Sequence, residues 1–124
     1  MKQSTKYTFM AHAIVAAIMG IPLLLVPGRM LPIFGWAEEG IDPLLSRVLG
    51  AVLIAFAWSS YRGWKATDWE QVSIIVETEM IFTVLAVIGL LRHLIGFSWP
   101  TGVWLIFALF AIFAIAWIVA WRRK

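Results

Sequence analysis

Apolar residues form four long runs along the chain, and polar residues are concentrated in the segments between them. The runs cover about residues 7–26, 43–61, 69–91 and 101–121. A helix rises 1.5 Å per residue, so roughly 20 apolar residues cross the hydrocarbon layer of a bilayer, which is about 30 Å thick. This length, repeated in all four runs, predicts an all-α membrane protein whose four transmembrane helices form an up-down bundle.

Proline, glycine and polar residues mark the ends of these runs. Pro27 and Gly28 follow the first run, which is too long for the apolar region of a secretory signal, so we expect it to be retained. The second run starts at Pro43, whose missing N–H does no harm in a first helical turn. The turn at residues 62–68 is short, so the second and third helices are predicted to be antiparallel neighbours.

The longest connection, residues 27–42, is too apolar for a free loop. Its apolar residues are Met30, Leu31, Ile33, Phe34 and Trp36. We expect them to lie along the membrane surface or to cap the bundle. This outer loop is therefore the candidate lid.

Composition agrees with a single transmembrane domain covering residues 1–124. Hydrophobic residues make up 62% of the chain and charged residues 14%, whereas soluble domains contain about 45–50% and about 25%. The four helices and their connections use the whole length, so no soluble catalytic domain is predicted. The chain has no cysteine, which excludes disulfides, thiolate nucleophiles and cysteine metal sites.

The distribution of Lys and Arg predicts that both termini lie on the cytoplasmic side of the cell membrane, because cytoplasmic loops of membrane proteins carry an excess of these residues. Seven lie on the side of the termini, namely Lys2, Lys6, Arg62, Lys65, Arg122, Arg123 and Lys124. Three lie on the other side, namely Arg29, Arg47 and Arg92. Because the basic residues are dispersed at helix ends, the net charge of +3 does not indicate nucleic-acid binding.

The eight tryptophans are interpreted as anchors at the two membrane surfaces, because indole rings favour the headgroup level. The outer set is Trp36, Trp99 and Trp104, and the inner set is Trp58, Trp64, Trp69, Trp117 and Trp121.

Away from the ends of the predicted membrane spans, four residues stand out as ionisable: His12, Arg47, Glu77 and Glu79. A charge at the centre of a membrane costs at least about 2.5–3.5 kcal/mol, so such residues usually face a cavity or a partner. The predicted depths of Arg47 and Glu79 differ by roughly 6 Å, a gap that a guanidinium can cover. An ion pair between Arg47 and Glu79 is therefore the first candidate site.

Helical phase separates the two glutamates, which point about 200° apart at 100° per residue. Glu79 shares a face with small and polar residues and is predicted to be buried, whereas Glu77 lies on a lipid-like stripe. His12 is predicted at a height nearer to Glu77, so a contact between these two is the secondary candidate. The face of the second helix expected to be buried carries Arg47, Gly50, Ala51, Ile54, Ala55 and Trp58.

Two interpretations of these residues stay open at this point. Arg47 and Glu79 could form a structural pair that fixes helix register, with Glu77 and His12 reaching toward the inner surface. Alternatively, they could line a polar midplane pocket that binds a ligand or passes protons.

The sequence gives no support for enzyme or cofactor chemistry. His12 and His93 are predicted on opposite sides of the membrane, so no metal site is predicted. No phosphate-binding loop or nucleophile motif is present. No cofactor and no catalytic residue are therefore assigned.

The segment Arg47-Val-Leu-Gly50-Ala51, which follows an amphipathic loop with proline and glycine, resembles the DoxX-like and related uncharacterised families of small four-helix membrane proteins. The resemblance in layout covers nearly the whole chain. It implies a four-helix bundle with an Arg on the second helix, and some members are described as subunits or partners of membrane redox systems. The cysteines that serve redox chemistry in other small membrane enzymes are absent here, so no oxidoreductase activity is inferred.

The sequence thus favours a non-enzymatic accessory or assembly subunit of a larger membrane complex. Its partner, besides the lipid bilayer, would be another membrane protein or a second copy of the chain. The small residues Ala108, Ala111, Ala114 and Ala116 of the fourth helix form the expected partner face. The alternative is a small ligand-binding or transport bundle, which predicts an open cavity between Arg47 and Glu79 beneath the outer loop.

Overall fold

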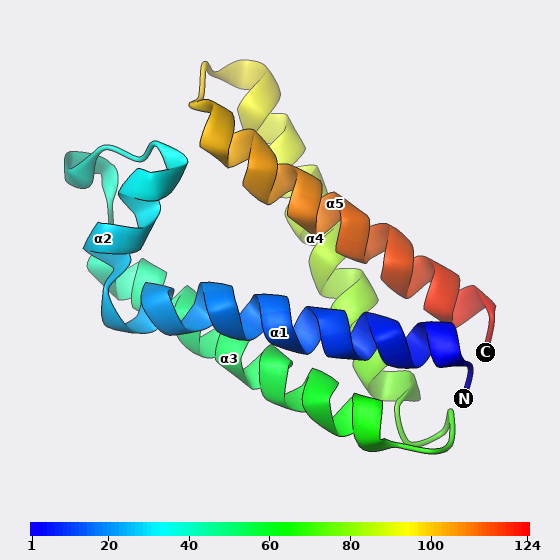
Figure 1. Ribbon diagram of the computed structural model, residues 1–124. Helices are drawn as coiled ribbons and strands as arrows, with labels where there is room; N and C mark the ends of the chain where they lie inside the picture. The colour runs from blue at the N-terminus through cyan, green and yellow to red at the C-terminus, as the bar shows by residue number, and fades with distance from the viewer.

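The structure, a computed structural model that describes residues 1–124, consists of helices and connecting turns. Four helices are long and apolar enough to cross a membrane: α1 (Gln3–Leu25), α3 (Pro43–Lys65), α4 (Ser73–Gly96) and α5 (Thr101–Arg122) (Figure 1). The predicted four-helix, multi-pass membrane architecture is confirmed. The main boundary differences are that α3 continues to Lys65 and that α4 runs from Ser73 to Gly96 rather than over residues 69–91.

The start of α3 is fixed by two adjacent residues. The Asp42 side chain accepts hydrogen bonds from the backbone N–H groups of Leu44 and Leu45, at 2.9 and 3.2 Å. Pro43 occupies the first helical position, where no intrahelical donor is needed. The first turn of α3 is therefore capped by Asp42, and Pro43 lies in this turn as the sequence predicts.

The four helices form two hairpins, α1 with α3 and α4 with α5. The hairpins converge at the end that carries both termini and the turn between α3 and α4 (Figure 1). They diverge toward the opposite end, where the outer loop and the turn between α4 and α5 lie. We call these two parts of the bundle the terminal half and the loop half.

The α1–α3 hairpin is held by a close approach of the two backbones. A Cβ atom on Gly50 would lie 2.8 Å from the Gly20 carbonyl oxygen, so only glycine fits there. The buried residues of α3 are Gly50, Leu53, Ser60 and Gly63. The predicted face is therefore only partly correct: Gly50 is buried, but Arg47, Ala51, Ala55 and Trp58 are exposed, because contact through Gly50 turns the Leu53–Ser60 side toward the bundle.

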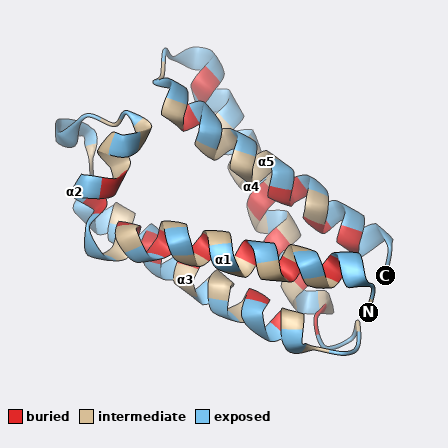
Figure 2. Cartoon of the chain, viewed as in Figure 1, coloured by how far each residue is buried: buried red, intermediate tan, exposed pale blue.

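The main core lies in the terminal half, where all four helices meet (Figure 2). Its buried residues are Phe9, Val72, Val76, Phe113, Trp117 and Ala120. Trp117 is fully buried and meets the Phe9 ring edge-on, with ring centroids 5.0 Å apart. The prediction of Trp117 as a surface anchor is thus wrong, because its helical phase places it beside Phe113 and Ala120 on the inward face of α5.

The outer loop caps the loop half, as its apolar residues predict. It contains α2 (Pro27–Met30) and the short helices η1 (Leu31–Phe34) and η2 (Glu38–Gly40). Met30 is buried with Leu23 and Leu53. At the start of α5, a Cβ on Gly102 would overlap the Phe34 carbonyl group, so η1 lies directly against that helix. The loop thereby bridges the ends of the two hairpins.

Candidate functional site

Arg47 caps the end of α1. Its side chain is exposed, and Nη1 donates a hydrogen bond of 3.1 Å to the carbonyl oxygen of Leu24. Carbonyl groups in the last turn of a helix lack intrahelical donors and carry the negative end of the helix dipole. The Arg47 guanidinium therefore ties the start of α3 to the end of α1.

The structure does not bring Arg47 and Glu79 together, so the predicted ion pair is wrong. Arg47 comes four residues after the start of α3, and Glu79 six residues after the start of α4. At 1.5 Å per residue they lie roughly 6 and 9 Å from opposite ends of the bundle, which leaves roughly 15 Å between them in a 30 Å layer. The later start of α4 accounts for much of the difference from the predicted gap.

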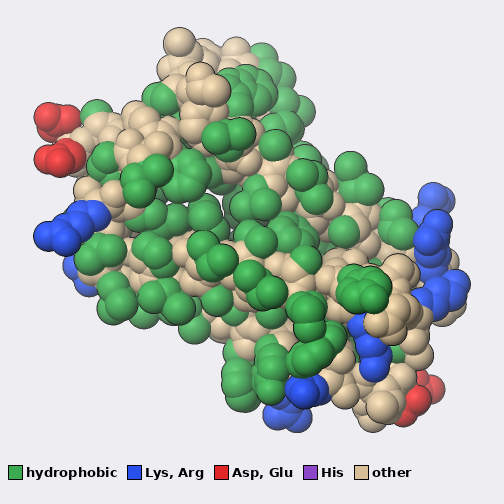
Figure 3. Space-filling view, viewed as in Figure 1, with side chains coloured by type: hydrophobic (Ala, Val, Ile, Leu, Met, Phe, Trp, Pro, Cys, Tyr) green, Lys and Arg blue, Asp and Glu red, His purple; other side chains and the backbone are tan.

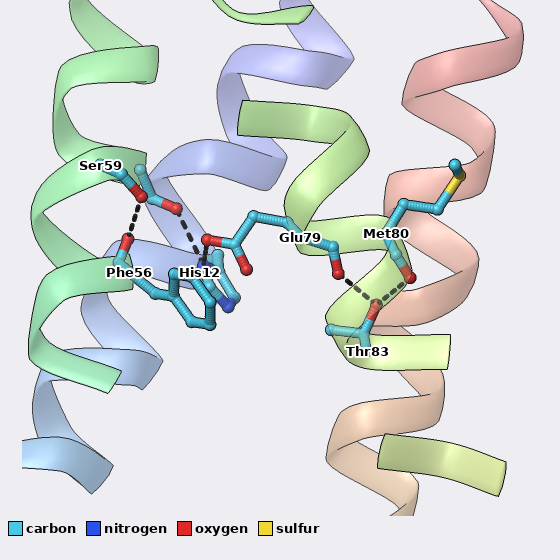
Figure 4. Close-up of polar contacts among 7 residues, drawn as sticks. His12, Phe56, Ser59, Glu79, Met80 and Thr83 are labelled. Carbon is cyan, nitrogen blue, oxygen red and sulfur yellow. Dashed lines mark hydrogen bonds and ion pairs between the residues drawn. The ribbon is translucent and has the colours of Figure 1, made fainter. Parts of the chain in front are cut away.

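Glu79 instead meets a histidine and a serine from two other helices. Its Oε1 atom lies 3.5 Å from Nδ1 of His12 on α1, and the same Nδ1 lies 2.9 Å from Oγ of Ser60 on α3. Glu79 points from α4 toward His12 in the interior of the bundle (Figure 4). Ser60 and Glu79 are fully buried, and His12 is 5% exposed. We call these three residues the polar cluster.

The two glutamates of α4 point in different directions, as their spacing predicts. Glu77 is exposed, on the same side of α4 as the exposed Ile81 and Ile88. The predicted contact between His12 and Glu77 is wrong. His12 lies on the buried face of α1, and Glu79 rather than Glu77 faces that helix.

The Glu79 carboxylate forms no hydrogen bond in the structure, although His12 and Ser60 lie near it. Neither of its oxygens makes a hydrogen bond, although both are buried. The nearby Thr83 hydroxyl donates to the backbone carbonyl of Glu79 at 2.7 Å rather than to the carboxylate (Figure 4). A buried polar group without a partner costs about 1–3 kcal/mol, and more when it is charged.

The Nδ1 atom of His12 and the Oε1 atom of Glu79 are 3.5 Å apart, and a proton on one of the two atoms makes their interaction favourable. Without one, two lone pairs would face each other in an apolar interior. With the proton on Nδ1, this N–H can donate to Ser60 Oγ or to the carboxylate; with it on Glu79, either the acid or the Ser60 hydroxyl donates to Nδ1, which has one lone pair. A proton on either His12 or Glu79 is therefore the arrangement that this contact favours.

The geometry differs from the catalytic and metal sites that these residue types can form. In a Ser–His–acid triad the serine and the acid bind different nitrogens of the imidazole, whereas here both meet Nδ1. The chain contains no group of three His, Asp or Glu side chains close enough to hold a metal ion. The polar cluster therefore matches neither the arrangement of a Ser–His–acid triad nor the ligand set of a metal site.

Two aromatic rings of α5 close the polar cluster on its remaining side. His12 meets Phe113 and Trp117 edge-on, with ring centroids 4.8 and 5.4 Å apart. Sequence reasoning missed these rings and Ser60. The available signal for Ser60 was its position seven residues after Leu53, on the same face of α3 as Gly63.

An apolar cavity lies in the loop half, between the diverging hairpins and beneath the outer loop. Its volume is about 290 Å³, and 12 of its 15 lining residues are hydrophobic. The outer loop contributes Trp36 and Ile41, and the walls include Leu49, Leu90 and Phe110. Asp42 and Ser46 supply polar groups beside the loop. We call this space the interhairpin cavity.

A smaller space of about 40 Å³ continues the interhairpin cavity toward the polar cluster. It is lined by His12 and Thr83, and it shares four wall residues with the larger space: Met19, Leu53, Ile106 and Phe110. The polar cluster therefore lies at the inner end of an apolar space that begins under the outer loop.

In comparisons with known proteins, no family model, no curated protein and no solved structure matches this chain. The resemblance to DoxX-like proteins therefore stays a prediction. The fold and the two features described above, the polar cluster and the interhairpin cavity, are the basis for a functional proposal.

Proposed function

We propose that the protein binds a small apolar or amphipathic molecule from the bilayer in the interhairpin cavity. The observation that supports this most directly is the cavity itself, whose apolar walls come from both hairpins and the outer loop. Its volume is close to the lower end of the range typical of small-molecule sites, about 300–1,000 Å³.

The cost of an empty cavity favours an occupant. Side chains that line a void lose dispersion contacts, and helices in a membrane associate largely through such contacts. The outer loop holds the hairpins apart, since η1 lies against the start of α5. A hydrocarbon chain of the bilayer would restore the missing contacts along Leu49, Leu90 and Phe110.

The polar groups of the cavity favour an amphipathic molecule over a pure hydrocarbon. Asp42 and Ser46 lie beside the outer loop, and His12 and Thr83 line the inner extension. A ligand with a hydroxyl group at one end satisfies either set with a single hydrogen bond. A straight-chain alcohol is therefore a suitable probe.

This proposal replaces the accessory-subunit hypothesis as the function that we favour. That hypothesis requires a free face of small residues on α5. Ala108 is exposed, but Ala114 is buried against the other helices and Ala111 is partly buried. The small residues thus serve partly as packing within the chain, whereas nothing within the chain fills the interhairpin cavity.

We also propose that the protein lies in the cytoplasmic membrane with both termini inside. Lys and Arg side chains gather at the terminal end of the molecule, with a smaller group at the loop end, and apolar side chains cover the face between them (Figure 3). The excess of basic residues at one end supports this orientation. The ligand would then enter at the outer half of the membrane.

The proposal is tested by titrating the reconstituted protein with 12-bromododecan-1-ol, because bromine quenches tryptophan fluorescence on contact. Trp36 lines the cavity, so the difference between the protein and its Trp36→Phe variant isolates the relevant signal. We expect that difference to saturate with the probe. Ser46→Phe, which fills the cavity, should abolish saturation, and Val48→Phe should retain it because Val48 is exposed and does not line the cavity.

Quenching that rises without saturation, equally in Ser46→Phe and Val48→Phe, would mean that the probe only partitions into the bilayer. That result would contradict ligand binding in the cavity. Circular dichroism of each variant checks that the helices are intact before the titration.

A further inference from the structure

A second space reaches the polar cluster from the opposite direction. A groove of about 320 Å³ lies between α3 and α4, and Glu79 is one of its lining residues. Ser59 and Thr78 line the same groove and add hydroxyl groups near the carboxylate. Glu79 therefore adjoins this groove while its carboxylate points toward His12, and His12 lines the small space that continues the interhairpin cavity.

The groove leads toward the terminal end of the bundle. It shares Ile75 with a space of about 440 Å³ at the turn between α3 and α4, which is lined by the polar side chains of Arg62, Lys65 and Gln71. Glu79 comes six residues after the start of α4, a depth of roughly 9 Å. Polar side chains thus line the space at the membrane surface, and Ser59 and Thr78 line the groove beside Glu79.

We propose that Glu79 and His12 form a proton-binding site that exchanges protons with water at the terminal end, through the groove between α3 and α4. The two carboxylate oxygens are buried and lack hydrogen bonds, and the groove that Glu79 lines has room for several water molecules. The Oε1 atom of Glu79 lies 3.5 Å from Nδ1 of His12, and a proton on either group relieves the repulsion between their lone pairs.

The space beyond His12 disfavours passage of protons further into the bundle. Nine of its 11 lining residues are hydrophobic, and its volume of about 40 Å³ is too small for a long chain of water molecules. Among the groups that face Glu79, only His12 of α1 is titratable. Ser59 and Ser60 of α3 are not titratable, the nearby α5 residues Phe113 and Trp117 are not either, and Glu77 points away on the exposed side of α4.

This site goes beyond ligand binding, because it places a proton beside the inner end of the interhairpin cavity. An occupant of the cavity would meet His12 in one of two protonation patterns. The site itself does not depend on that occupant, so its test can succeed or fail independently of the alcohol titration.

The absence of cysteine makes water access directly measurable. We would introduce Thr78→Cys in the groove and Ile115→Cys on the exposed outer side of α5, at a comparable distance from the terminal end. Thiolates form only where water reaches them, so the charged thiol reagent MTSET should modify Thr78→Cys about tenfold or more faster than Ile115→Cys. Equal and slow modification of both would overturn the proposed water path.

Proton binding is tested separately with dicyclohexylcarbodiimide, an apolar reagent that adds to protonated carboxyl groups. Mass spectrometry of peptides should find the adduct on Glu79, rising as the pH falls because only the acid reacts, and Glu79→Gln should lose it. No adduct on Glu79 at any pH, or an adduct independent of pH, would overturn the exchange of protons at this site.

Discussion

The terminal half and the loop half of the bundle contain parts of the same helices but pack differently. In the terminal half, Phe9, Val76 and Trp117 are fully buried where the four helices meet. In the loop half, the hairpins diverge and leave an apolar cavity of about 290 Å³ beneath the outer loop. Helix packing thus provides rigidity at one end, and separation of the hairpins provides a binding space at the other.

The difference follows from where small and large side chains lie. Gly20 and Gly50 join α1 to α3 in the loop half, but they act within one hairpin and do not draw the second hairpin closer. Trp117 and Phe113 reach from α5 to α1 in the terminal half and thereby join the two hairpins. The polar cluster lies at the boundary, where it is enclosed by the rigid half and adjoins the open one.

The largest expected effect is a difference in the free energy of unfolding between two truncations, one in the terminal half and one in the loop half. Trp117→Ala should lower the free energy of unfolding by about 3–5 kcal/mol, because it leaves a cavity between Phe9 and His12. Ile106→Ala should cost about 1 kcal/mol, because Ile106 is only partly buried and already borders a cavity. Resistance to SDS-induced unfolding, followed by pulse proteolysis, measures both. Equal losses would mean that the two halves are equally packed.

A smaller effect on stability is expected at the contact between α1 and α3, which lies within one hairpin. Gly50→Ala should destabilise the protein by about 1–3 kcal/mol, because the added methyl group meets the backbone of α1. Gly89→Ala is the matched control: no atom lies within 4 Å of its added Cβ, so helix propensity should raise stability by about 0.5–1 kcal/mol. Thermal unfolding in detergent measures both. A neutral Gly50→Ala would contradict the close approach of α1 and α3.

The smallest effect concerns the charged residues, and a pair of double-mutant cycles measures it. His12→Ala and Glu79→Ala should show a coupling energy of about 0.5–1.5 kcal/mol, because the two side chains meet between helices. Arg47→Ala and Glu79→Ala should be additive within about 0.5 kcal/mol, because they share no partner. Unfolding in mixed micelles is the measurement. Coupling only between Arg47→Ala and Glu79→Ala would instead support the ion pair that the sequence predicts.

Much of the site was within reach of the sequence, and the part that was not depends on helix boundaries. Phase along α4 correctly placed Glu79 inside and Glu77 outside, because the period of 3.6 residues is independent of neighbouring helices. The predicted depth of Glu79 in the membrane was wrong. The residues before Ser73 form a turn rather than the start of α4, and this places Glu79 farther from Arg47. An error of one helical turn was enough to change its partner.

The sequence by itself determined the four membrane-crossing helices, since hydrophobic length and the cost of an unsatisfied backbone in lipid leave few alternatives. It also determined which residues are unusual in such an environment, among them His12 and Glu79. Only the tertiary structure decided that they meet, that Ser60 joins them and that a cavity lies beside them. These features depend on the rotation and divergence of the hairpins, which are set by contacts between side chains far apart in the chain.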